Sequence, residues 1–109
     1  MPTKYLVLGQ SAPSATTATT LYTVPSATET IVSTITVCNR GTAAATYRIA
    51  VRPNGATLAN QHYIAFDAEI GSKSTTALTL GITADATDII EVYGSTGDLS
   101  FAAFGSEVS

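Results

Sequence analysis

The chain alternates apolar and polar residues over short segments that end at glycine, proline, asparagine or aspartate. Period-two alternation is typical of half-buried β-strands, and no segment keeps the apolar stripe of a helix over three turns. The pattern predicts strands at residues 4–9, 20–24, 30–38, 45–52, 61–69, 75–82, 88–93 and 99–105. We therefore expect an all-β fold, a single antiparallel β-sandwich of about eight strands, with either an immunoglobulin-like or a jelly-roll Greek-key connection.

The same alternation predicts which side chains face the core. In the third and sixth strands the large aliphatic residues fall on one side: Ile31, Ile35, Val37, Leu78, Leu80 and Ile82. In the fourth strand Tyr47, Ile49 and Val51 point one way, and Arg48, Ala50 and Arg52 point the other way. In the last strand the alternation shifts phase after Ala102, so we expect a β-bulge there, because one extra residue flips every later side chain.

The length of 109 residues fits one domain, residues 1–109. Within it, residues 1–18 are a candidate N-terminal tether, a first strand followed by a small, polar loop. The apolar run at residues 5–8 is too short for the h-region of a signal peptide, which is about 7–15 residues long. No uninterrupted apolar run reaches the roughly 18 residues of a membrane span, so we expect no membrane contact.

Charge is scarce in this chain. Charged residues make up 12% of the sequence, where ordinary domains carry about 25%. A weakly charged surface loses its water at little cost, which suits faces that are covered by other proteins; the alternative is a soluble, threonine-rich β domain without a partner. The net charge of −3 argues against nucleic acid, and the single Cys38 excludes an intrachain disulfide and fits a reducing cytoplasm.

Signals of catalysis or metal binding are missing from the sequence. There is one histidine, His62, and no G-x-S-x-G, H-E-x-x-H or Cys/His cluster. One cysteine and one histidine are too few for zinc, and the acidic pairs Asp67/Glu69 and Asp85/Asp88 lie outside any EF-hand loop. We therefore expect no enzyme activity, no cofactor and no metal, and a structural or interface role for His62.

Three of the five basic residues, Arg40, Arg48 and Arg52, lie close together in the sequence. Arg48 and Arg52 would lie about 13 Å apart on one strand face, which suits two separate carboxylate contacts better than one clamp. Two interpretations stay open: a protein interface, or weak salt bridges within the domain. The first predicts that alanine at Arg48 or Arg52 weakens assembly and leaves melting nearly unchanged. Its candidate interface residues are Arg40, Arg48, Arg52, His62 and Tyr63.

The run LYTVPSATETIVSTITVCNRGTAAATYRIAVRPNGATLANQHYIAFD, with the ending LSFAAFGSEVS, resembles small virion structural proteins of tailed bacteriophages. The most specific segments are VCNRG at 37–41, YRIAVRP at 47–53 and NQHYIAF at 60–66. The resemblance covers nearly the whole chain. It implies a place in the virion after synthesis in the host cytoplasm, and it assigns no catalytic residue.

Resemblance and composition together lead to an ordered set of expectations. The first is a capsid decoration, or cement, protein that binds and stabilises the major capsid shell and self-associates as a homo-oligomer. The alternative is a tail, baseplate or tail-fibre component that contacts other virion proteins or the host surface. A carbohydrate-binding module is a third class, against which the absence of tryptophan counts.

Overall fold

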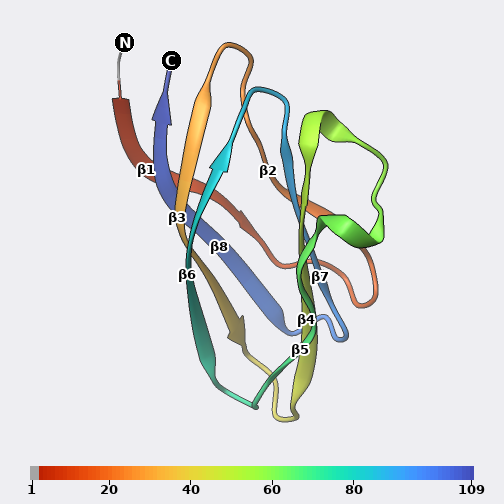
Figure 1. Cartoon of the computed structure of the whole chain (residues 1–109). Coiled ribbons are helices and arrows are strands. Elements are labelled where there is room, and N and C mark those ends of the chain that lie inside the picture. Colours follow the sequence, from red (N-terminus) through yellow and green to blue (C-terminus); the bar gives the residue numbers. More distant parts are fainter. Residues whose placement is uncertain (1–2) are drawn as a thin grey trace.

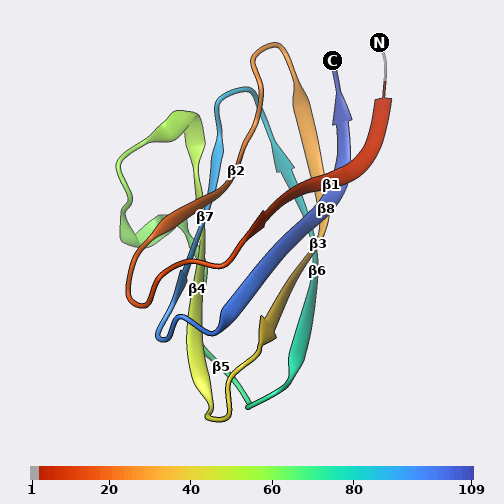
Figure 2. The same cartoon turned by 180° about the vertical axis from the view of Figure 1, so that it is seen from behind.

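The protein folds into two facing β-sheets of four antiparallel strands each, as the computed structural model shows for residues 3–109 (Figures 1 and 2). The strands are β1 (Thr3–Ser11), β2 (Thr19–Thr23), β3 (Glu29–Asn39), β4 (Ala45–Arg52), β5 (Tyr63–Ile70), β6 (Thr75–Ala84), β7 (Ile89–Gly94) and β8 (Leu99–Val108). Two short 3-10 turns, η1 (Pro53–Gly55) and η2 (Asn60–His62), lie between β4 and β5. The expectation of an eight-stranded antiparallel sandwich is confirmed. No helix within residues 3–109 has the length and apolar character to cross a bilayer.

The strand order identifies the connection. Sheet A has the order β1-β8-β3-β6, and sheet B has the order β2-β7-β4-β5. If the chain is folded once into a long antiparallel hairpin, its paired strands are β1·β8, β2·β7, β3·β6 and β4·β5. These same pairs occur here, the first and third in sheet A and the other two in sheet B, so the hairpin has been rolled up into two sheets. This is the jelly roll, so the immunoglobulin-like alternative is set aside.

The core lies between the inner faces of the two sheets. Its fully buried large side chains come from both sheets: Val24, Val32, Ile35, Val37, Ile49, Ile90, Val92, Leu99 and Phe101. Tyr47 of sheet B meets Phe101 of sheet A edge to face, with ring centroids 6.4 Å apart. The alternation predicted for β4 is confirmed, because Tyr47 and Ile49 are buried and Val51 packs against the core.

The predicted bulge in the last strand is wrong. β8 keeps its alternation past Ala102, with Ala103 buried and Phe104 half-buried on the outer face. The extra residues lie instead on the two neighbouring strands, at Leu8 of β1 and Ser33 of β3. The Ser33 hydroxyl donates a hydrogen bond of 3.1 Å to the carbonyl of Phe104. The alternation of β8 therefore does not change phase; Phe104 only interrupts the apolar–polar pattern because it is an aromatic residue on the outer face.

These bulges also move two residues that alternation places in the core. Ile31 is 47% exposed and Leu80 is 44% exposed, whereas both were predicted to be buried. The extra residue Ser33 reverses the phase of β3, so Val32 points inward in place of Ile31. In β6 the register shifts opposite Ser33, where Gly81 has a φ of +62°. Both exposed side chains belong to sheet A.

Two buried polar side chains connect separate elements. The Asn39 amide donates to the carbonyls of Ala43 and Gly71 and accepts from the amide of Gly41, which joins the β3–β4 loop to the β5–β6 turn. The Tyr22 hydroxyl of β2 shares a 2.8 Å hydrogen bond with Thr30 and donates to the Glu107 carboxylate, both in sheet A. Burial, and then the hydrogen bond to Glu107, raises the pKa of Tyr22 to about 12.

The candidate tether is part of the sandwich in the isolated chain. Residues 3–11 form β1, which pairs with β8 from Thr3 opposite Val108 to Ser11 opposite Phe101. In the following loop Pro13 is buried, and the amide of Thr16 donates to the Gly94 carbonyl at 2.8 Å. Residues 1 and 2 of the tether lie outside the described residues. Tethering to a partner stays a prediction.

Candidate functional site

Four of the five predicted interface residues belong to one region of sheet B. Arg48 and Arg52 are on the outward side of β4, His62 ends η2, and Tyr63 begins β5. The connection at residues 53–62 projects from the same sheet, on the side away from sheet A (Figure 1). Arg40 lies elsewhere, in the β3–β4 connection, where it donates to the Ser100 hydroxyl at 2.8 Å and to a loop carbonyl.

Arg48 is held between two aromatic rings. Its guanidinium carbon lies 4.2 Å from the ring centroid of Phe66 and 4.4 Å from that of Tyr93. Its Nε and one terminal nitrogen donate to the two carboxylate oxygens of Asp67, at 2.6 Å and 3.3 Å. This bidentate bond lowers the pKa of the Asp67 carboxyl and raises that of the guanidinium. Cation–π contact with two rings and a two-pronged ion pair fix the guanidinium in one orientation.

Irregular backbone in β5 creates this arrangement. The register between β4 and β5 shifts between the pairs Tyr47–Ala68 and Ile49–Ala65, which leaves two residues, Phe66 and Asp67, in the bulge. Asp67 has a φ of +51°, in the left-handed region that aspartate tolerates better than most residues. Both side chains are exposed as a result. A bulged edge strand also resists pairing with a foreign strand, so this edge is better suited to side-chain contacts.

Tyr63 extends the same group of side chains. Its ring centroid lies 4.9 Å from that of Phe66 at an interplanar angle of 82°. A shallow hollow of about 450 Å³ is lined by Asn60, Tyr63 and Phe66, and Phe66 is 56% exposed. We call Arg48, Tyr63, Phe66 and Tyr93 the arginine–aromatic cluster.

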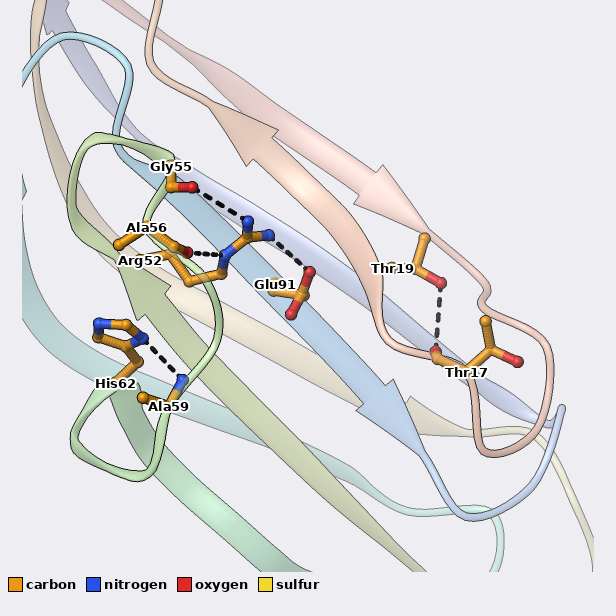
Figure 3. Close-up of polar contacts among 8 residues, drawn as sticks. All are labelled: Thr17, Thr19, Arg52, Gly55, Ala56, Ala59, His62 and Glu91. Carbon is orange, nitrogen blue, oxygen red and sulfur yellow. Dashed lines mark hydrogen bonds and ion pairs between the residues drawn. The ribbon is translucent and has the colours of Figure 1, made fainter.

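Arg52 has a different role, because its bonds are directed into the chain. It pairs with Glu91 of β7 at 2.9 Å and donates to the carbonyls of Ala56 at 2.7 Å and Gly55 at 3.3 Å (Figure 3). The side chains of Arg52 and Glu91 are only 20% and 12% exposed. Arg52 therefore fastens the connection after β4 to the sheet. The expectation of two separate carboxylate contacts is confirmed, with Asp67 for Arg48 and Glu91 for Arg52. Both are salt bridges within the domain, as the second of the two interpretations predicted, and the interface interpretation stays a prediction.

His62 closes the turn that leads into β5. Its Nδ1 accepts a hydrogen bond of 3.1 Å from the amide of Ala59 (Figure 3), and its own amide donates to the Ala59 carbonyl. The sequence predicted a structural or interface role for His62. In the structure the ring accepts from a backbone amide, which fixes the η2 turn beside Tyr63.

Of the acidic pairs that the sequence singled out, Asp85 and Asp88 support turns. The Asp88 carboxylate accepts from the amide of Asn54 at 2.7 Å and from the amide of Asp85 at 2.9 Å. Within residues 3–109 no three His, Cys, Asp or Glu side chains come together as metal ligands would. The free thiol of Cys38 is half-buried on the outward side of β3 in sheet A.

Sequence reasoning missed Phe66, and the predicted interface residues did not include Tyr93. Strict alternation places Phe66 on the face opposite Tyr63, and only the bulge brings the two rings together. Comparison of the chain with protein-family models and with curated proteins gave no match. Function is therefore inferred from the surfaces, the fold and the sequence resemblance.

Proposed function

We propose that this protein is a non-enzymatic structural protein of a tailed-bacteriophage virion that decorates the capsid shell. In this role the arginine–aromatic cluster binds the major capsid protein. The observation that carries the proposal is Arg48, held between Phe66 and Tyr93 on an exposed sheet face. Arginine, tyrosine and phenylalanine are enriched at protein interfaces, and arginine and tyrosine dominate their energetic hot spots.

Preorganisation supports binding through this cluster. Arg48 is already fixed by Asp67 and two rings, so it loses little side-chain entropy when a partner covers it. Modest interfaces of about 1,200–2,000 Å² also add up strongly when many copies attach to one symmetric particle. The jelly roll recurs in viral capsid domains, which supports the assignment by analogy of fold alone.

The test is binding of the purified chain to phage particles that lack it, measured by co-sedimentation and quantitative gel analysis. We expect saturation at hundreds of copies per particle and at least about a tenfold loss of affinity in Phe66→Ala, which removes one wall of the Arg48 site. Thr42→Ala, at an exposed loop position, is the control and should bind as the original chain does. Unchanged binding of Phe66→Ala would refute the role of the cluster.

A tail, baseplate or tail-fibre role with host-surface adhesion is the second candidate. The hollow beside Asn60, Tyr63 and Phe66 favours it, because aromatic rings next to an amide can contact both the apolar face and the hydroxyls of a sugar. A tail component would be present in a few tens of copies or fewer, whereas a decoration protein would be present in hundreds. Glycan-array binding that is lost in Tyr63→Ala would favour adhesion.

A further inference from the structure

We propose that the outer face of sheet A is the surface through which two copies of this chain associate face to face. Residues that pair across antiparallel strands share a face, so the register defines this surface. Cross-strand neighbours on this face form rows that run perpendicular to the strands. One row crosses all four strands and contains Tyr5, Ser106, Ile31 and Thr83. The next three rows, centred on Phe104, Ala102 and Ser100, contain no charged residue. Charge lies at the two ends of this face: Glu29 is in the terminal row, opposite Val108, and at the other end the Arg40 guanidinium donates to the Ser100 hydroxyl.

The end of this face near the chain termini is apolar as well as uncharged. Tyr5 is 86% exposed, Val7 50% and Ile31 47%. Phe104 lies beside Val7, and a groove of about 390 Å³ is lined in part by Tyr5, Ile31 and Phe104. Single exposed apolar residues are ordinary, but a contiguous group on a flat sheet marks an interaction surface.

The scarcity of charge on the outer face of sheet A indicates that the partner covering it is a second copy of this chain. A partner that covers an uncharged face without burying an unpaired charge must itself present few charges. The outer face of sheet B carries Arg48 with Asp67 and Arg52 with Glu91, so stacking sheet A on sheet B would bury ionic groups. Sheet A of another copy presents no such group in its central rows. In a two-fold arrangement the same patch serves both partners, and Tyr5 of each copy would enter the groove of the other.

The size of the face is sufficient for a dimer. Its strands are 9 to 11 residues long. At about 3.3 Å per residue they extend for roughly 30 Å, and four strands about 4.8 Å apart span roughly 19 Å. Two such faces in contact would bury about 1,200 Å², at the lower end of specific interfaces. We therefore expect a dimer that dissociates on dilution.

The test is sedimentation equilibrium of the full chain over a dilution series. The expected mass at high concentration is twice the 11.2 kDa of one chain. Ile31→Lys places a charge in the centre of the face and should raise the dimer dissociation constant at least about tenfold. Ile64→Lys is a matched control, because Ile64 is 46% exposed but lies on β5 of sheet B, and it should leave the mass unchanged.

Three results would overturn the inference: a monomer at every concentration, an oligomer larger than a dimer, or equal dissociation by Ile31→Lys and Ile64→Lys. An oligomer larger than a dimer would contradict the inference because two stacked sheet-A faces cover each other and leave no such face for a third chain. If circular dichroism shows that Ile31→Lys is unfolded, Thr83→Lys takes its place, because Thr83 is exposed in the same row on the edge strand β6. A dimer that persists in folded Thr83→Lys also overturns it.

The result is independent of the virion role. A monomeric Ile31→Lys chain that still co-sediments with particles would leave capsid binding intact. A Phe66→Ala chain that no longer binds particles but remains a dimer would leave the pairing through sheet A intact.

Discussion

Arg48 and Arg52 differ in the groups that they contact. Arg48 contacts side chains on an exposed face, with Asp67 46% exposed beside it, whereas Arg52 binds a shielded carboxylate and two backbone carbonyls. Spacing and residue type were enough to predict two carboxylate contacts from the sequence. The difference in role could not be predicted, because it depends on Glu91 and on the path of residues 53–56, which only the fold brings to Arg52.

Alanine substitution should separate the two arginines. We expect Arg52→Ala to lower the free energy of unfolding by about 2–3 kcal/mol, because it leaves Glu91 without its cation and releases the turn after β4. Arg48→Ala should shift the melting temperature by only a few degrees, because its ion pair is exposed. Urea unfolding of both variants checks this, and an equal loss in the two would contradict it. The earlier expectation of nearly unchanged melting is thus kept for Arg48 alone.

Tyr22 should make stability fall at alkaline pH. Its pKa is raised from 10.0 to about 12 in the fold, so the folded state holds the hydroxyl proton more tightly than the unfolded state. The resulting stabilisation is fully present below pH 10 and is lost as the pH rises through 12. We expect the stability advantage over Tyr22→Phe to be largest near pH 8 and to shrink between pH 10 and 12. A constant difference in urea unfolding across this range would argue against it.

At the scale of elements, the strands were predictable and their bulges were not. Alternation and turn residues located all eight strands, and Pro53-Asn54-Gly55 forms a tight turn in which Asn54 has a φ of +52° and Gly55 of +65°. Bulges at Leu8, at Ser33 and beside Gly81 depend on register between strands that are far apart in the sequence. The pattern of one strand cannot contain that information, and therefore Ile31 and Leu80 were misplaced.

Gly105 of β8 packs directly against the backbone of the bulged strand β3. A Cβ atom at this position would collide with the carbonyl oxygen of Ile31, and backbone atoms cannot move aside as a flexible side chain can. We expect Gly105→Ala to lower the free energy of unfolding by about 3 kcal/mol. Gly97→Ala is the control, because its nearest neighbour would be the amide nitrogen of Ala15 at 3.9 Å and its stability should hardly change. Urea unfolding measures both, and a tolerated alanine at Gly105 would show that β3 and β8 can separate there.

At the scale of the whole molecule, the jelly roll presents two outer faces of different chemistry. Sheet B displays paired charges and aromatic rings beside the connection at residues 53–62, and the central rows of the outer face of sheet A contain no charged residue. Low overall charge pointed to covered faces, but only the strand order assigns each residue to a face.

The pairing of Thr3 with Val108 places both ends of the described chain beside each other on sheet A, as Figure 2 shows. A peptide or an enzyme fused genetically to either end would leave the sandwich from the same corner. The outer face of sheet B would stay clear of such a fusion. The fold is therefore suited to serve as a display scaffold that carries cargo without obstructing the arginine–aromatic cluster.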